Sequence, residues 1–306
     1  MSLLTVGTVA FDDIETPFGK AEMAIGGAAT YISLAASYYT KNIHLVSVIG
    51  DDFPEETLND MRSRGVNLDG LQVRKGEKSF FWAGKYHDNM NDRDTLDTQL
   101  NVLATFDPVL PDTYKTPEYL MLGNLTPDVQ IRVIEQLEKR PKLIALDTMN
   151  FWMDNALDSL MKVIKMIDAL IINDEEARQL SGEHSLVKAA AKIMELGPKY
   201  LVIKKGEHGA LLFHRDQIFF APALPLAEVF DPTGAGDTFA GGFMGYMAQT
   251  DDLSFDNMKR GIIYGSAMAS FCVEKFSIQR LLELDDIAIT DRIKRFVNLV
   301  NFDAKL

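Results

Sequence analysis

Short apolar runs alternate with longer stretches of helical periodicity over the first half of the chain. The short runs are apolar at consecutive positions, as in internal strands of a parallel sheet, where both faces are covered. We predict strands at Leu3–Val9, His44–Ile49, Tyr119–Leu122, Leu143–Leu146 and Ala169–Ile172. Alternating strands and helices predict βαβ units and therefore an α/β fold.

The stretches between these strands have the spacing of amphipathic helices. We predict helices at Ala28–Tyr39, Pro54–Arg64, Pro127–Glu138, Leu157–Ile167 and Glu175–Leu180. The two prolines suit a first helical position, because the missing N–H has no partner there. Acidic residues follow each proline in the first turn, where the helix dipole favours them.

The stretch from Leu71 to Ala104 interrupts this alternation. Phe80–Tyr86 and Asp97–Val102 are predicted to be extended, with no helix between them. The segment joining them, His87–Asp94, is polar and turn-rich, which predicts a surface loop. A second, smaller β element follows, and the pattern fits an edge hairpin as well as a lid over a site.

Beyond Lys199 the pattern changes again. Strands are predicted in close succession at Tyr200–Lys204, Ala210–Phe213 and Gln217–Phe220, with tight polar turns between them. Such spacing predicts an antiparallel continuation of the sheet. From Gly236 onward helical patterns dominate.

Composition limits the classes of function. A chain of 306 residues with 47% hydrophobic residues can bury a large core, and we expect one main domain. A net charge of −13 disfavours nucleic acid as a partner, because phosphate backbones are bound mainly by Lys and Arg. The start lacks a signal-peptide pattern and no run is long enough for a membrane span, so we expect a cytoplasmic protein. The single Cys272 is expected to be a buried thiol.

The candidate chemistry lies in Asp231-Pro-Thr-Gly-Ala-Gly-Asp237, directly before an apolar, helix-compatible run. A Gly-Ala-Gly turn opening a buried helix leaves backbone N–H groups without partners, which makes an anion site. Asp237 could simply cap the helix, but a cap does not need two preceding glycines. Phosphoryl transfer to an alcohol needs both parts: donors for the transferred charge and a carboxylate to accept the hydroxyl proton.

Other nucleotide and metal motifs fit less well. Gly234 and Gly236 begin like a dinucleotide fingerprint, but Phe239 occupies the place of the third glycine. Asp237 would also set a negative charge beside a pyrophosphate. The sequence contains neither a P-loop motif nor a zinc-binding pattern, and its five His residues are scattered.

At this point the chain resembles the ribokinase-like, or PfkB, family of carbohydrate and nucleoside kinases. Asp231–Phe239 is similar to that family's C-terminal signature, and Gly26-Gly27 to its N-terminal glycine pair. The resemblance covers about residues 3 to 300. It implies a three-layer α/β/α sandwich with a mostly parallel central sheet and a small β lid. We expect a single domain over residues 1–306, with lid strands mainly at about 10–25 and 71–104.

The resemblance also implies roles at the reaction centre. Asp237 would be the general base, and the backbone N–H groups of Gly234, Ala235 and Gly236 would hold the developing charge. Residues implied to bind the acceptor are Asp12, Gly26, Gly27 and Asn101. Asp12 is expected at the end of the first strand, and the adjacent Asp13 competes for its role.

The remaining implied roles concern ATP and its ions. Asn173 and Glu176 are similar to the family's element that acts on the ATP phosphates through Mg²⁺ and water, although a helix cap explains them too. Residues implied to contact ATP are Asn173, Lys205, Gly206, Gly209 and Thr233. Asp231 resembles a ligand for a monovalent cation such as K⁺ in some members.

The acceptor is left open by the sequence. The resemblance disfavours a ribokinase proper, because ribose-directed members usually have a Lys- or Gly-rich continuation and an Asn after the glycine pair, whereas this chain continues as Ala28-Ala-Thr-Tyr31. The main prediction is an ATP-dependent kinase for the hydroxymethyl group of a sugar or polyol; a nucleoside kinase is the alternative, and a noncatalytic ligand sensor a remote one. Trp82 and Tyr86 could stack on a substrate or pack in the lid, and Arg93 is expected to be solvated. Related folds often pair through the lid sheet, and the apolar Phe80–Trp82 could serve such an interface, so the resemblance implies a homodimer through the lid.

Overall fold

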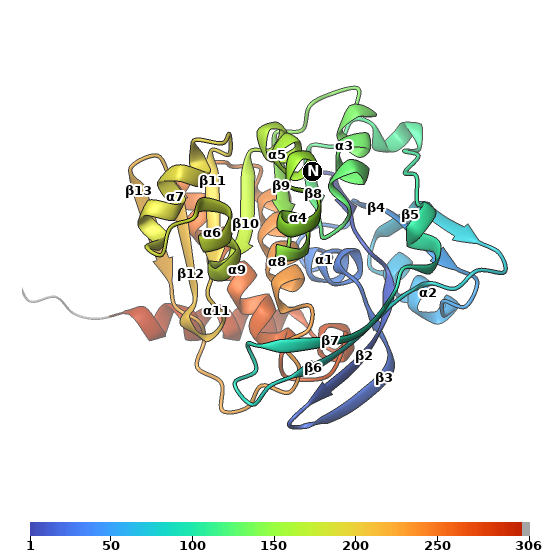
Figure 1. The fold of residues 1–306 in the computed structure, drawn as a ribbon. Helices are drawn as coiled ribbons and strands as arrows, with labels where there is room; N and C mark the ends of the chain where they lie inside the picture. Colours follow the sequence, from blue (N-terminus) through green and yellow to red (C-terminus); the bar gives the residue numbers. More distant parts are fainter. Residues whose placement is uncertain (302–306) are drawn as a thin grey trace, which may run out of the picture.

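The computed structural model describes residues 1–301, which form a three-layer α/β/α sandwich with a smaller sheet beside it (Figure 1). The main sheet has the order β13-β12-β11-β10-β9-β8-β1-β4-β5. Its strands are β1 (Leu3–Val6), β4 (Ile43–Gly50), β5 (Val66–Arg74), β8 (Tyr119–Leu122), β9 (Leu143–Asp147), β10 (Ala169–Asn173), β11 (Tyr200–Lys204), β12 (Ala210–His214) and β13 (Gln217–Ala221). The predicted fold class is confirmed.

The sheet is parallel from β5 to β11, and β12 and β13 continue it in antiparallel register. The antiparallel continuation predicted after Lys199 is therefore confirmed. Successive strand residues point to opposite sides and both are buried; Leu3 belongs to one core cluster and Leu4 to the other. This double burial is the physical reason for the consecutive apolar residues in the sequence.

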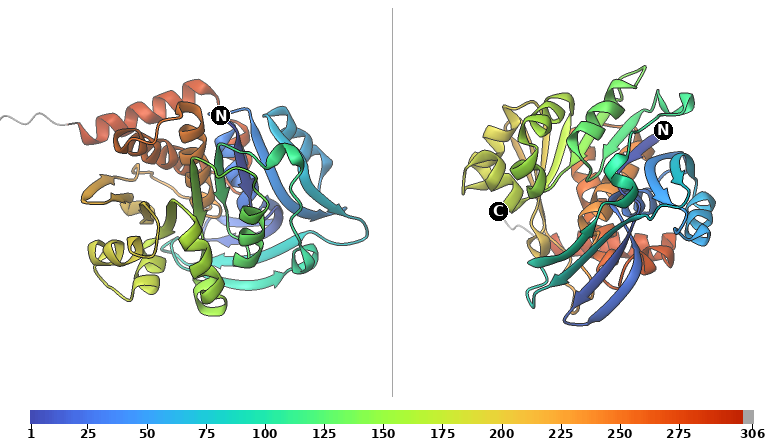
Figure 2. Two further views of the ribbon diagram at one scale, coloured as in Figure 1. Left: turned by 90° about the horizontal axis from the view of Figure 1, so that it is seen from above. Right: turned by 45° about the vertical axis from the view of Figure 1, so that its right-hand side comes forward.

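Helices cover both faces of the sheet (Figures 1 and 2). One face carries α1 (Ala28–Ala36), α2 (Glu55–Ser63), α8 (Ala235–Thr250), α9 (Phe255–Cys272), α10 (Gln279–Leu282) and α11 (Asp286–Val300). The other carries α3 (Pro127–Glu135), α4 (Asn150–Asn155), α5 (Leu157–Met166), α6 (Asp174–Ser181) and α7 (Leu186–Met194). Short 3₁₀ turns lie at Asn101–Thr105 (η1), Asp112–Tyr114 (η2) and Gly206–His208 (η3). Among the residues described, no helix combines the length and apolarity that a membrane crossing requires.

The four-stranded second sheet, which we call the lid, has the order β3-β2-β6-β7. Its strands are β2 (Ala10–Thr16), β3 (Gly19–Gly26), β6 (Phe80–Tyr86) and β7 (Arg93–Gln99). It extends from the main sheet as a twisted ribbon below the sandwich in the view of Figure 1. The lid therefore brings together two hairpins, β2–β3 and β6–β7, which are separated in the sequence by strands of the main sheet.

Three expectations at the lid differ from the structure. The first strand ends at Val6, so Asp12 is not at its end but inside β2 of the lid. β5 pairs with β4 in the main sheet and ends at Arg74, so the second lid segment starts at Phe80. Asn101 lies in the turn η1 rather than in a strand, with a φ of 46°. Strand propensity could not show these boundaries, because pairing with distant strands decides them.

Candidate active site

Polar side chains end three neighbouring parallel strands of the main sheet. Asp147 is the last residue of β9, Asn173 of β10 and Lys204 of β11. These strands are adjacent in the sheet, and Asn173 and Lys204 are register partners. In open parallel sheets, ligands bind outside the carboxyl ends of the strands. The chain therefore concentrates charge at the edge where a substrate is expected.

Lys204 and Asp147 form a buried ion pair, with 2.7 Å between the Lys204 Nζ and the Asp147 Oδ2. Burial alone would lower the pKa of Lys204, but the carboxylates of Asp147 and Glu176 raise it above its usual value. The lysine also lies under the start of α8, since a Cβ placed on Gly236 would be 2.9 Å from its Nζ. Neither member of this pair was assigned a role from the sequence, because each looks like an ordinary strand end there.

Glu176 and Asn173 form a capping box at the start of α6. The Asn173 side chain accepts a hydrogen bond from the Glu176 N–H, and the Glu176 Oε2 accepts one from the Asn173 N–H, both at 2.8 Å. Both the capping role and proximity to the site thus hold for these residues. Burial raises the pKa of Glu176 to about 7, although Lys204 opposes the shift.

The segment Asp231–Asp237, which we call the anion loop, leads directly into α8. Gly234 is the N-cap residue with a φ of 73°, and no side chain caps the helix. Asp237 is therefore not the N-cap residue; it lies in the first turn of the helix, three residues after Gly234. A glycine N-cap leaves the helix N-terminus open to an anion.

Of the three predicted N–H donors, one is used inside the loop. The Ala235 N–H donates to the Pro232 carbonyl oxygen at 3.1 Å. Within residues 1–301, the N–H groups of Gly234 and Gly236 have no backbone acceptor outside the helix. The structure therefore favours the two glycines over Ala235 as donors to a ligand.

Glycines are required at this centre by close packing. A Cβ on Gly234 would lie 2.4 Å from the ring of Tyr31, which is buried beneath the loop. A Cβ on Gly27, where φ is 93°, would lie 2.5 Å from the Thr8 carbonyl oxygen. On Gly26 it would lie 1.9 Å from the carboxylate of Asp12. The N-terminal glycine pair thus makes room for Asp12, and Tyr31 supports the anion loop.

Asp12 lies on the face of the lid that is turned toward the sandwich. Ala10, Ile14 and Thr16, at alternate positions of the same strand, are buried there too. Burial, together with the charges of Asp231, Asp237 and Asp13, raises the pKa of Asp12 to about 8. Asp13 is on the opposite face, where its Oδ1 accepts a hydrogen bond from the Met23 N–H at 2.6 Å. Asp12 is therefore the one of the two that faces the site.

Asp237 shares this acidic environment. Burial and the charge of Asp147 raise its pKa to about 7, while Lys204 and Arg93 oppose the rise. A carboxylate with a pKa close to neutrality is suited to general-base catalysis, because it is ionised yet basic enough to accept a proton. The geometry therefore provides a base and N–H donors on a single helix turn.

The lid reaches the anion loop and the turn after β11. The Tyr86 hydroxyl and the Thr233 Oγ1 are 3.2 Å apart, and the Thr16 hydroxyl donates to the Phe230 carbonyl oxygen at 3.0 Å. A Cβ on Gly206 would lie 2.8 Å from the side-chain oxygen of Asn91, at the tip of the β6–β7 loop. The lid is thus in contact with both loops that flank the base.

The buried Asp231 ties the anion loop to the segment after α9. Its Oδ1 accepts a hydrogen bond from the Thr233 N–H at 2.8 Å and its Oδ2 one from the Ser277 N–H at 2.9 Å. Ser277 has a φ of 58° and donates from its hydroxyl to the Ile25 carbonyl oxygen of β3. Since backbone donors already satisfy both carboxylate oxygens, we assign no step to K⁺ at this position.

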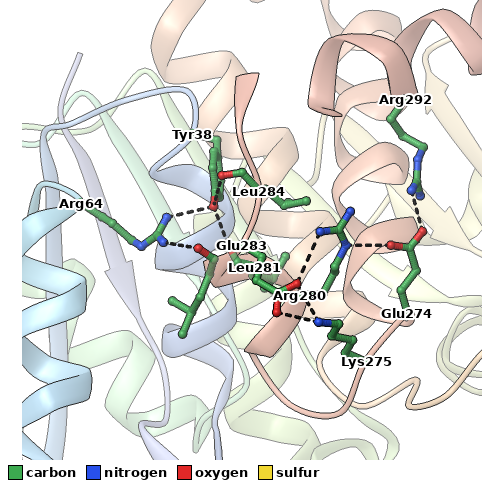
Figure 3. Close-up of polar contacts among 10 residues, drawn as sticks. Tyr38, Arg64, Glu274, Lys275, Arg280, Leu281, Glu283, Leu284 and Arg292 are labelled. Carbon is green, nitrogen blue, oxygen red and sulfur yellow. Dashed lines mark hydrogen bonds and ion pairs between the residues drawn. The ribbon is translucent and has the colours of Figure 1, made fainter. Parts of the chain in front are cut away.

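An ion-pair network holds this supporting segment in place (Figure 3). Glu274 accepts from Arg280 at 2.9 Å and from Arg292 of α11 at 2.5 Å. The Arg292 guanidinium also lies 3.7 Å above the ring centre of Phe271. Figure 3 also shows Arg64, whose guanidinium donates to the Tyr38 hydroxyl and the Leu282 carbonyl oxygen. The network joins α9, α10 and α11 next to Ser277.

The other predicted residues lie around this centre in different ways. Lys205, Gly206 and Gly209 form the turn at η3 that Asn91 of the lid touches. The Asn101 side chain donates to the Ser79 carbonyl oxygen at 2.8 Å, so its amide supports the base of the lid. Cys272 is buried, as predicted.

The residues present fit a magnesium ion carried by a nucleotide. Among residues 1–301 no three His, Cys, Asp or Glu side chains gather closely enough to cage a metal ion. Mg²⁺ does not need such a cage, because it is usually held by one or two carboxylates, water and substrate phosphates. Glu176 and Asp147 offer those carboxylates beside the anion loop.

Residues 6–284 match the family model described as pfkB family carbohydrate kinase. The chain is 27% identical over 250 residues to the cytidine kinase of Thermococcus kodakarensis, covering 80% of this chain and 87% of that protein. The nucleoside kinase of Burkholderia thailandensis in complex with ADP and inosine has a similar fold, with a TM-score of 0.78 at 19% identity, covering 100% of this chain and 99% of that one. A ribokinase II-type protein of E. coli in complex with ATP and Mg²⁺ gives a TM-score of 0.78 at 18% identity, covering 97% and 99%.

Proposed function

The chain belongs to the pfkB family of carbohydrate kinases and is an ATP-dependent phosphotransferase with a hydroxyl acceptor; we propose that this acceptor is the primary hydroxyl of a nucleoside. The sugar or polyol that was the main prediction from the sequence becomes the second candidate for the acceptor. The proposal depends on one juxtaposition in the lid and is supported by the cytidine kinase relative.

That juxtaposition is the pairing of Asp12 with Trp82. The two residues are register partners in the parallel strands β2 and β6, so their side chains leave the lid on the same face. Neighbouring strands lie about 4.8 Å apart, so the two side chains can contact adjoining parts of one ligand. A carboxyl group that bonds ribose hydroxyls would thus stand beside an indole that can stack on a base.

Trp82 is held in a position that suits stacking. The indole crosses Gly84, since a Cβ there would lie 2.0 Å from a ring carbon. Its Nε1–H donates to the Thr95 hydroxyl at 3.3 Å, and the side chain is only half-buried. An aromatic ring fixed by packing and a hydrogen bond, yet not covered by the core, offers a face to a ligand at little entropic cost.

The chemistry assigned to the chain follows from the site geometry. Asp237 accepts the proton of the attacking hydroxyl, and the N–H groups of Gly234 and Gly236 hold the negative charge on the transferred group. Lys204 adds positive charge from below, fixed by Asp147. Glu176 and Asp147 would hold Mg²⁺ through its water, and the ion would neutralise phosphate charge. The lid excludes water, which would otherwise compete with the acceptor.

A panel of acceptors tests the proposal. ADP release is measured with pyrimidine nucleosides, purine nucleosides, ribose, deoxyribose and small polyols at equal concentrations. We expect the largest kcat/KM with a nucleoside, because only a nucleoside uses both Asp12 and Trp82. A larger kcat/KM with ribose or another free sugar than with any nucleoside would contradict the proposal.

Trp82→Leu is the matched variant for this panel. It keeps an apolar side chain but removes the stacking face, which is worth about 1–3 kcal/mol per base. The nucleoside kcat/KM should fall about tenfold or more, whereas the slow reaction with ribose should not change. Equal losses for both acceptors would mean that Trp82 only packs the lid.

A further inference from the structure

The charge balance of the site is incomplete with the residues assigned so far. Five carboxyl groups surround it, from Asp12, Asp147, Glu176, Asp231 and Asp237. The buried cation, Lys204, is already paired with Asp147 at 2.7 Å. A nucleoside triphosphate brings several further negative charges, and charge transferred between oxygens needs stabilisation at the moment of transfer. A cation that is free to bind phosphate is therefore expected close by.

Arg93 occupies the part of the lid that lies over the anion loop. It is the first residue of β7 and the register partner of Tyr86, whose hydroxyl contacts Thr233. Two residues earlier, Asn91 approaches Gly206 on the other side of the site. The Arg93 side chain thus starts between the two loops that flank Asp237.

The guanidinium of Arg93 has no acceptor. Within the part of the chain that the structure describes, it forms neither a hydrogen bond nor an ion pair, although the chain is rich in carboxylates. Its guanidinium carbon lies 5.9 Å from the ring centre of Trp82. At that distance the guanidinium lies beside the indole, and its N–H groups are not used by the protein. Five donors are therefore available without a protein partner.

The positive charge of Arg93 affects the pKa values of two carboxyl groups at the reaction centre. It opposes the rise in the pKa of Asp237 that burial and Asp147 cause. It also opposes the burial-driven rise in the pKa of Glu176. These carboxyl groups lie on α8 and α6, and Arg93, as the register partner of Tyr86, leaves the lid on the face that contacts Thr233. Arg93 was expected to be solvated, and its side chain is exposed in the structure.

We infer that Arg93 binds the phosphoryl group during its transfer, donating in-plane N–H bonds to oxygens that are not in the line of attack. The inference rests on the proposed site around Asp237. Arg93 makes and breaks no covalent bond; it adds positive charge on the side opposite the anion loop. Because it belongs to the lid, this charge arrives only when the lid covers the site, which makes transfer depend on closure.

The variants Arg93→Gln and Arg93→Lys test the assignment, with Arg215→Gln as the control. Arg215 is also exposed, but it lies at the far end of β12, which runs antiparallel away from the site. We expect kcat to fall about 10²-fold or more in Arg93→Gln, with partial recovery in Arg93→Lys, which keeps the charge but loses the bidentate geometry. Arg215→Gln should keep wild-type kinetics. A kcat for Arg93→Gln within about twofold of wild type would overturn the inference.

Ligand binding separates this role from a structural one. By calorimetry, Arg93→Gln should bind ADP with unchanged affinity but bind ADP with aluminium fluoride and the best acceptor at least about tenfold more weakly. Equal weakening of both ligands, or of neither, would overturn the assignment to the transferred group. The best acceptor from the panel is used whatever its class, so a wrong nucleoside assignment leaves this test intact.

Discussion

At the scale of single residues, the site depends on carboxyl groups that are buried close to one another, where ionising them costs folding free energy. Asp12 is 5% exposed and close to the charges of Asp231 and Asp237. Its pKa rises to about 8 from 3.8, so the folded protein holds a proton that the unfolded chain releases at lower pH. Strain of this kind is common at functional sites, where stability is lower than the fold would allow.

Asp12→Asn should therefore raise the free energy of unfolding while weakening the binding of the acceptor. Between the two pKa values the folded state binds more protons than the unfolded state, so wild-type stability falls as the pH rises. Asn has no proton to hold, and the free energy of unfolding should exceed the wild-type value by at least about 1 kcal/mol at pH about 8. The difference should vanish below pH about 4. Thermal unfolding across this pH range measures it.

Asp13→Asn is the control, because its side chain lies on the other face of the lid. That variant should not show the pH-dependent gain. The KM for the acceptor should rise about tenfold or more in Asp12→Asn, since a hydrogen bond to a charged or buried group is lost. A pH dependence of stability identical to wild type in Asp12→Asn would contradict the environment described for Asp12.

At the scale of elements, the start of α8 carries the reaction chemistry because glycines shape it. Gly234 combines a positive φ with contact to the Tyr31 ring. The positive φ strains the backbone of any residue other than glycine. A side chain that meets the Tyr31 ring would, in addition, push the anion loop and its N–H donors out of place.

Gly234→Ala and Gly76→Ala separate these two requirements. Gly76 has a φ of 75° and nothing within 4 Å of an added Cβ, whereas the Cβ on Gly234 meets Tyr31. Both variants should lose about 1 kcal/mol of stability from backbone strain. Only Gly234→Ala should also lose kcat, by about 10²-fold or more, because the donors are displaced. Steady-state kinetics with equal kcat losses in both variants would refute the role of the loop position.

The sequence could predict some elements of the site and not others. The anion loop is local, so Asp237 and its glycines were readable from one segment. The pair Lys204 and Asp147 was not, because the two residues meet only when β9, β10 and β11 align. Side chains alternate between the two faces of a strand, so Asp12 and Asp13 lie on opposite faces of β2. Which of them faces the site depends on where β2 starts and how it pairs, and the sequence alone does not show this. The missing helix predicts a second β element, which fits an edge hairpin as well as a lid, and the register of Asp12 with Trp82 required the structure.

At the scale of the whole molecule, the sandwich supplies the catalytic edge and the lid supplies the acceptor side. Contacts of Thr16, Tyr86 and Asn91 hold the lid against loops of the sandwich. The outer face of the lid carries Glu15 in ion pairs with Lys20 and Lys85. Phe81 packs toward the main core, so the apolar run at the start of β6 is partly used within one chain. A homodimer through the lid stays a prediction.

The central claim is that Asp237 removes the proton of the acceptor hydroxyl. Its most direct test is the kcat of Asp237→Asn for acceptor-dependent ADP release. Asn keeps the size of the side chain but cannot accept a proton. The control is Asp256→Asn, in the first turn of the next helix, α9. We predict that Asp237→Asn folds as the wild type does and loses about 10² to 10⁴ in kcat, while the control keeps its activity. A folded Asp237→Asn with a kcat near the wild-type value would contradict the claim.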